Sequence, residues 1–215
     1  MDRDTFLTRV GQASLTSILP DTPPTNSLVV PDGIDLLDLF RVRAQAVNAV
    51  IHGPVTRHGA PRVVTAIAGG HDAETFMVWD DLPVSGVPSG LQALGMRRVD
   101  HIVGDERGEQ NLAYQTLDIG VTGALGALAE SGSLILTHGP GRPRMASLIA
   151  DVHIALLDLS TLEWTLADWA AKNPALAART TNLVLVTGPS RTGDIEQQLN
   201  LGVHGPRHVH IVMIR

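Results

Sequence analysis

The sequence predicts an α/β protein of three layers, with a mostly parallel sheet between layers of helices. Apolar, β-branched runs alternate along the chain with segments of helical periodicity, which is typical of βαβ units. Hydrophobic residues make up 44% of the chain and aromatic residues only 3%, so Val, Leu, Ile and Ala have to build the core. This composition suits a sheet covered by Ala-rich helices, and 215 residues fit one large domain with a short extension.

The extension is expected at the N-terminus. Residues 2–19 place apolar side chains at helical spacing, and the Pro-rich segment 20–27 that follows breaks the helix. We therefore predict an N-terminal helix and linker over residues 1–27 and an α/β domain over residues 28–215. Two interpretations of the helix stay open, because it can dock on the domain or contact a partner subunit.

Within the domain, each element is predicted from its hydrophobic pattern. Short apolar runs predict strands within 47–55 and at 75–79, 99–103, 117–121, 133–137, 152–157, 183–186 and 209–214. Helical spacing predicts helices at 35–46, 88–94, 124–130 and 161–172. Residues 61–68 fit neither pattern clearly. The alternation of the two kinds of segment favours right-handed βαβ connections.

Charge and cysteine content exclude several classes of function. The net charge of −6 argues against nucleic acid or an anionic membrane as the main partner. The sequence also shows no apolar leader and no stretch long enough to cross a bilayer. Because the sequence contains no Cys, this chain cannot form disulfides or bind iron–sulfur clusters through thiolates. We expect a cytoplasmic protein.

The segment after the strand predicted at 183–186 is the most informative part of the sequence. Gly188 ends the strand, Ser190 and Thr192 offer hydroxyl groups where a helix can begin, and Asp194 falls in its first turn. The free N–H groups of a helix N-terminus bind anions, and Arg191 adds a forked cation beside them. These residues together predict a site for a carboxylate or a phosphate.

Two other Gly-rich segments are expected to contribute to this site. Segments 120–123 and 138–142 follow predicted strands, and the carboxyl ends of neighbouring parallel strands meet at one edge of a sheet. We therefore expect both to converge with 187–191. This convergence adds Thr122, Gly123 and Arg142 to the predicted ligand site, and His204 is expected to point into the same site. For Arg142 the alternative is a solvated loop, and for His204 it is a turn cap.

Other polar residues suggest weaker possibilities. Glu130 is predicted at the end of a helix, where a carboxylate is unfavourable unless it has a ligand or an Arg partner, although it can also simply face solvent. His208 and His210 lie two apart on a predicted strand and so face the same side, but without an evident third ligand we predict no metal. Ser190 lacks the spacing of a nucleophile elbow. The sequence contains neither of the common Gly-rich nucleotide-binding motifs.

Four motifs resemble the LUD domain family. They are Gly120–Ala124, Ala129–Leu134, Gly188–Glu196 and Gly202–Pro206. The resemblance covers roughly residues 34–215 and is closest to the lactate utilisation protein C group. Gly193 stands where the family commonly has Ala, and segment 147–153 lacks a Pro that is often found there. The fold implied is that of NagB, ribose-5-phosphate isomerase and CoA transferases, in agreement with the α/β pattern.

The resemblance implies a place in the oxidation of L-lactate to pyruvate, beside two iron–sulfur partner subunits. Since this chain has no Cys, it is then expected to be a subunit without a redox centre or cofactor of its own. Such a subunit would bind a small carboxylate or support assembly, and it could also form homo-oligomers. The alternative is an independent enzyme resembling CoA transferases or cyclo-ligases. In that case Glu130 of Glu130-Ser-Gly132 would be the candidate catalytic carboxylate.

Overall fold

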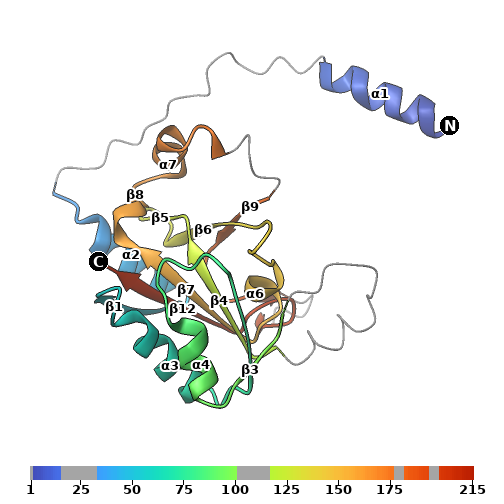
Figure 1. Cartoon of the computed structure of the whole chain (residues 1–215). Coiled ribbons are helices and arrows are strands. Elements are labelled where there is room, and N and C mark those ends of the chain that lie inside the picture. Colours follow the sequence, from blue (N-terminus) through green and yellow to red (C-terminus); the bar gives the residue numbers. More distant parts are fainter. Residues whose placement is uncertain (1, 16–32, 101–116, 177–181, 194–198) are drawn as a thin grey trace.

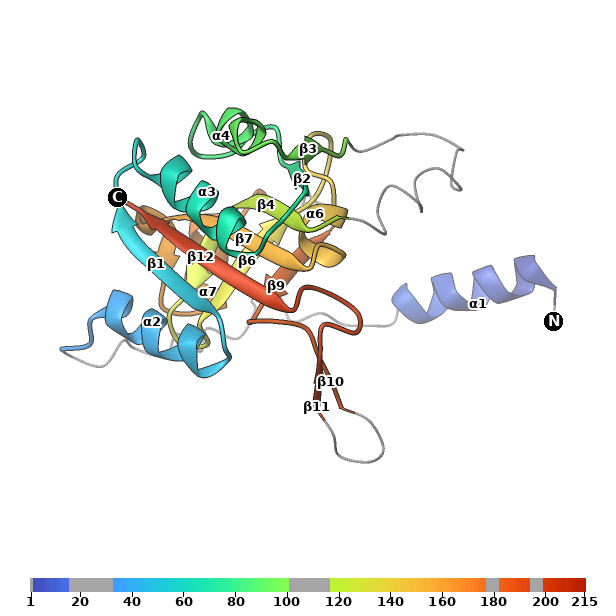
Figure 2. The same cartoon turned by 90° about the horizontal axis from the view of Figure 1, so that it is seen from below.

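The computed structural model describes residues 2–15, 33–100, 117–176, 182–193 and 199–215 (Figure 1). Helix α1 (Arg3–Leu15) begins with Asp2, whose carboxylate accepts a hydrogen bond from the Thr5 amide at 2.8 Å. Helix α1 lies apart from the domain in both views, and Phe6 is exposed (Figures 1 and 2). The predicted linker over residues 20–27 falls outside the described residues.

The centre of the domain is a six-stranded sheet with the order β1-β12-β7-β4-β2-β3. Every pairing in it is parallel, which confirms the predicted sheet. The strands are β1 (Val50–Val55), β2 (Thr75–Val78), β3 (Arg97–Arg98), β4 (Ile119–Ala124), β7 (Val152–Asp158) and β12 (His208–Ile214). The last strand of the chain therefore lies inside the sheet, between β1 and β7.

Helices α3 (Ala60–Gly70) and α4 (Val87–Ala93) cover one face of this sheet (Figure 2). Residues 61–68, which were ambiguous in the sequence, thus belong to a helix. Val64 and Leu91 pack with Ile154 and other branched residues of the strands in a core without solvent access. Burial of such side chains stabilises the domain by about 1.5–3 kcal/mol each.

A smaller sheet and further helices cover the other face. This sheet has the order β8-β5-β6-β9 and consists of β5 (Gly126–Leu128), β6 (Ser133–Thr137), β8 (Leu162–Glu163) and β9 (Leu183–Val186). Helices α2 (Leu36–Ala46), α6 (Met145–Leu148) and α7 (Leu166–Lys172) flank it, with the 3₁₀ turn η1 (Leu159–Thr161) before β8. Asp35 caps α2 by accepting from the Leu37 amide at 2.8 Å. Phe40 of α2 reaches the core between the layers.

The helix predicted at 124–130 is wrong, because this segment continues from β4 into β5. Ala127 and Leu128 are both buried, so segment 126–128 has no face toward solvent. Its Ala and Leu residues are typical of helices in composition alone. A Cβ atom at Gly126 would lie 2.4 Å from Nε1 of Trp169. Glycine at this position therefore lets β5 lie close beneath α7. Helix α7 begins at Leu166 rather than near residue 161, where it was predicted to start.

The helix predicted after Ser190 is also wrong. Residues Arg191–Gly193 form β10, which pairs with β11 (Leu199–Leu201) in an antiparallel hairpin that projects from the domain (Figure 2). The Ser190 amide donates to the Pro206 carbonyl at 2.9 Å, and the Ser190 carbonyl accepts from Gly202 at 2.9 Å. These bonds close the base of the hairpin and leave no helix N-terminus here.

The strand predicted at 99–103 is displaced, since β3 occupies Arg97–Arg98 and residues 101–103 lie outside the described part. The other strands, and the helices at 35–46 and 88–94, are confirmed to within a few residues. Among the described residues, none of the helices has the length and apolar character needed to cross a bilayer.

The close approach of α6 to β4 gives a test of the packing. A Cβ atom on Gly120 would lie 1.6 Å from the Ala146 carbonyl oxygen, which is backbone and cannot move aside easily. Gly120→Ala should therefore lower the free energy of unfolding by roughly 3 kcal/mol in urea denaturation. The matched control is Gly69→Ala in α3, where a Cβ meets nothing within 4 Å. This change should raise the free energy of unfolding by up to about 1 kcal/mol. Equal effects of both changes would contradict this packing.

Candidate functional site

The three Gly-rich segments predicted to converge do not meet at one edge. Strands β6 and β9 are antiparallel, with Thr137 opposite Leu183 and Leu134 opposite Val186. Segment 138–142 therefore leaves one end of the small sheet and segment 187–191 leaves the other end. The predicted convergence assumed that the strands before these segments are parallel neighbours in one sheet. It is wrong because β6 and β9 belong to a second sheet, in which they are antiparallel.

Thr122 and Gly123 lie inside β4 rather than in a loop. Thr122 is fully buried, and its hydroxyl is 2.9 Å from Nε2 of His153. His153 is also fully buried; this burial, and then the nearby His138, lower the pKa of His153 to about 4. Among the residues that the structure describes, none is a hydrogen-bond partner of Nδ1 of His153. Thr122 and Gly123 are therefore part of the interior of the domain.

Arg142 binds within the protein instead of facing an open site. Its guanidinium pairs with Asp81, donates to Oγ1 of Thr137 at 3.0 Å and lies 5.6 Å from the centre of the Trp79 ring. A guanidinium with these three partners ties the loop before α6 to the end of β2. Arg142 thus explains the shape of this loop without a ligand.

The structure places the Gly188 segment beside the start of β6, the strand that follows the turn containing Glu130. Glu130 lies in the turn between β5 and β6, half-buried, with its amide donating to the Trp164 carbonyl at 3.1 Å. Ser133, the first residue of β6, contacts the Thr187 hydroxyl at 2.7 Å. Gly188 packs on the end of α2, where an added Cβ would lie 2.4 Å from the Val47 carbonyl oxygen.

The remaining residues of the predicted anion site lie along the hairpin. Arg191 is exposed and forms no ion pair with any residue that the structure describes. Thr192 is half-buried, His204 is exposed, and Asp194 lies outside the described residues. Because the Ser190 amide is already bonded to Pro206, this amide cannot hold an anion here. Anion binding by the Arg191 side chain stays a prediction.

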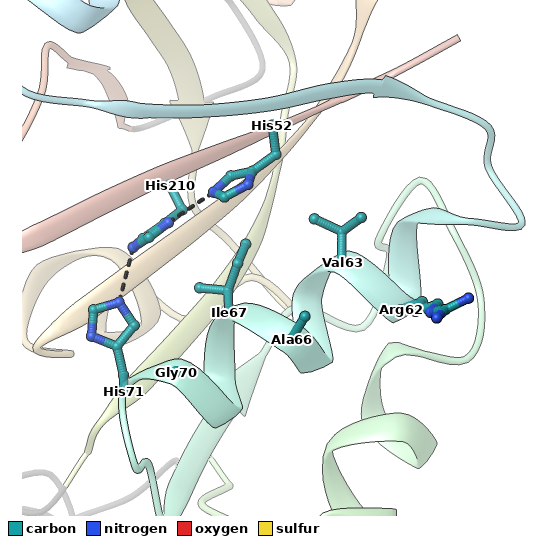
Figure 3. A pocket seen from close by; sticks show the side chains of 8 residues that line it. All are labelled: His52, Arg62, Val63, Ala66, Ile67, Gly70, His71 and His210. Carbon is teal, nitrogen blue, oxygen red and sulfur yellow. Dashed lines mark hydrogen bonds between the residues drawn. The ribbon is translucent and has the colours of Figure 1, made fainter.

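A pocket that the sequence did not predict lies between α3 and the edge of the large sheet (Figure 3). Its volume is about 450 Å³. Its lining consists of His52 from β1, His210 from β12, His71 at the end of α3, and the α3 residues Arg62, Val63, Ala66, Ile67 and Gly70. Most of the lining is apolar, and the polar groups are three imidazoles at one end and one guanidinium. Such a mixture is typical of small-molecule sites.

The three imidazoles form a continuous hydrogen-bonded chain, which is visible in Figure 3. Nδ1 of His210 is 2.9 Å from Nε2 of His52, and Nε2 of His210 is 3.0 Å from Nε2 of His71. His210 therefore uses both ring nitrogens, donating through one and accepting through the other. The ring of His208 lies 4.8 Å from that of His71. We call His52, His210 and His71 the histidine chain.

The histidine chain is held in its neutral form. Burial, and then the neighbouring His52, His71 and His208, lower the pKa of His210 to about 4. Burial also lowers the pKa of His52 and of His71; His208 lowers the pKa of His71 further, whereas Asp151 opposes that shift. Neutral imidazoles can accept a proton or bind a metal. Among the described residues, however, no three His, Asp or Glu side chains are placed to hold a metal ion.

Only part of this site could be predicted from the sequence. The two-residue spacing of His208 and His210 placed them on one face, and the structure confirms that both lie next to His71 on the α3 side. His52 and His71 were missed because their partners are more than a hundred residues away in the chain. An isolated His on a predicted strand, such as His52, was the available signal.

Comparison with known proteins places the chain in a family. A model of the LUD domain matches residues 37–214, which is most of the chain. The chain belongs to the LUD domain family. A crystal structure of a DUF162 family protein from Deinococcus radiodurans has a TM-score of 0.60 and covers 84% of this chain and 96% of that one. At 21% identity, this similarity supports the α/β fold alone.

Several relatives carry the same name. Lactate utilization protein C of Macrococcus caseolyticus is 34% identical over 175 residues, which are 79% of this chain and 68% of that protein. Lactate utilization protein C of Halalkalibacterium halodurans is 33% identical over 150 residues, 66% of this chain and 64% of that protein. An uncharacterized protein of Neisseria meningitidis is 36% identical over 103 residues, 47% of this chain and 44% of that protein. The matched part of the chain thus spans less than two thirds of the length of the last two of these relatives.

The low pKa of His210 predicts how stability depends on pH. The unfolded chain, with an ordinary His pKa near 6.5, binds protons more readily than the folded chain, so stability should fall as the pH drops from about 6.5 to 4. His210→Gln should reduce this loss by roughly 1–2 kcal/mol, allowing for partial solvent screening. Urea denaturation at several pH values measures it, with the exposed His58→Gln as the control. An identical slope in the wild type and His210→Gln would refute the assignment.

Proposed function

We propose that this chain takes part in lactate utilisation as a cytoplasmic subunit without a redox centre of its own. The observation that carries the proposal is its membership of the LUD family together with relatives named lactate utilization protein C. Oxidation of L-lactate to pyruvate removes two electrons. Since this sequence has no Cys to bind an iron–sulfur cluster, we infer that partner subunits hold the electron acceptors.

We further propose that the chain binds a small carboxylate in the histidine pocket. The pocket has what such a ligand requires, namely a free imidazole N–H at one end of the histidine chain to bind an oxygen atom and an apolar wall formed by Val63, Ala66 and Ile67. The hairpin offers Arg191 as a second possible anchor, but the Ser190 amide beside it is already used. The geometry therefore favours the pocket over the predicted Gly188–Asp194 segment.

The proposed role in metabolism is tested by deleting the gene in its own organism. The deletion strain should grow poorly on L-lactate as sole carbon source and normally on pyruvate, because only the step before pyruvate is affected. Growth should return when the gene is supplied on a plasmid. Normal growth on L-lactate, in an organism without another gene of this family, would contradict the role.

The two possible carboxylate sites are distinguished by matched variants. In calorimetric titration with L-lactate, His210→Asn should weaken binding by about 10-fold or more, because it breaks the two N···N contacts that orient His52 and His71 toward the ligand. Loss of one charge-assisted hydrogen bond from either ring costs roughly 1.5–3 kcal/mol. Arg191→Ala should leave the affinity within about twofold of the wild type. Thermal unfolding of both variants checks that the fold persists. The reverse order of effects would place the ligand at the hairpin.

A further inference from the structure

The histidine pocket contains little fixed positive charge where a carboxylate would meet the histidine chain. Arg62 is the one guanidinium in the described lining, and it precedes His71 by nine residues along α3. At 1.5 Å per residue, this separation is about 13 Å along the helix axis. Figure 3 shows Arg62 near the opposite end of α3 from His71. An anion of the size of L-lactate that contacts the histidine chain therefore lies several ångströms from this guanidinium.

The charged groups around the histidine chain come from four places. Strand β1 contributes His52, and β12 contributes His208 and His210. Helix α3 contributes Arg62 and His71. From the start of β7, Asp151 acts on His71 and is itself paired with Arg207 at 3.3 Å. The charge of this carboxylate is thus balanced by Arg207. Among the described residues that line the pocket, none places a fixed cation next to the imidazoles.

The histidine chain can take up one proton without losing its internal hydrogen bonds. Each of its two N···N contacts requires a single hydrogen atom, and His210 supplies or receives one at each ring nitrogen. An added proton can be placed on Nδ1 of His52 or of His71, at the ends of the chain. Both end nitrogens then carry a hydrogen atom, and shifts of the hydrogen atoms within the two N···N contacts move the positive charge from ring to ring, so the three rings share it.

We propose that the histidine pocket binds a small monocarboxylate together with one proton, which the histidine chain takes up from solvent. This inference rests on the proposed carboxylate site. A carboxylate a few ångströms from a partly buried imidazole favours its charged form strongly, and this attraction outweighs the burial that keeps the empty pocket neutral. The bound species is in effect the carboxylic acid, with its proton held by the protein. No bond of the ligand is made or broken.

The experiment measures the number of protons taken up. L-lactate is titrated calorimetrically into the full chain at pH 7.5 in phosphate, HEPES and Tris buffers, whose ionisation enthalpies differ. The slope of the observed enthalpy against the buffer ionisation enthalpy should correspond to about one proton per lactate. The dissociation constant should rise about tenfold for each pH unit between pH 7.5 and 8.5. His58→Asn, at an exposed position outside the pocket, should retain both properties.

Variants of the chain distinguish failure of this inference from failure of the proposed site. His52→Asn and His71→Asn keep His210 but remove one end of the histidine chain, and each should lower the proton number below one half. Tight lactate binding with no proton uptake in the wild type would overturn the inference and leave the carboxylate site intact. No binding of lactate by the wild-type protein would overturn both.

Discussion

The structure depends on the insertion of the last strand, β12, between β1 and β7. In this position β12 pairs along its whole length with β7, from His208 opposite Val152 to Ile214 opposite Asp158, and its other edge pairs with β1. Without it the parallel sheet would be divided and both cores exposed. The same insertion brings His210 against His52 and the end of α3. The fold and the histidine chain thus have one common cause.

Local patterns were sufficient for most elements and insufficient for their arrangement. The run 183–186 predicted β9 to the residue, but nothing in its pattern indicated that it pairs antiparallel with β6 in a second sheet. Strand β5 was mistaken for a helix because Ala and Leu are good helix formers, whereas the pairing with β8 that holds it extended on one edge is not local in the sequence. Similarly, Ser and Thr after Gly188 are as suitable for a hairpin as for a helix cap.

The candidate site was predicted even less completely, for the same reason. Placing His208 and His210 on one face needs only the two-residue period of a strand. Joining them to His52 and His71 needs the order of the strands, which depends on packing across the whole domain. The segment with the strongest apparent anion motif, Gly188–Asp194, instead has its Ser190 amide bonded to Pro206. A motif made of backbone N–H groups is therefore informative only when the secondary structure around it is correct.

We propose that imidazoles from β1, β12 and the end of α3 form the ligand site of this LUD domain. A crystal structure of the protein with L-lactate tests it most directly. The density of the carboxylate should lie within hydrogen-bond distance of Nδ1 of His52 or of His71, at an end of the histidine chain, with the apolar wall of α3 on its other side. Density at the Arg191 guanidinium, with the histidine pocket filled only by water, would contradict it.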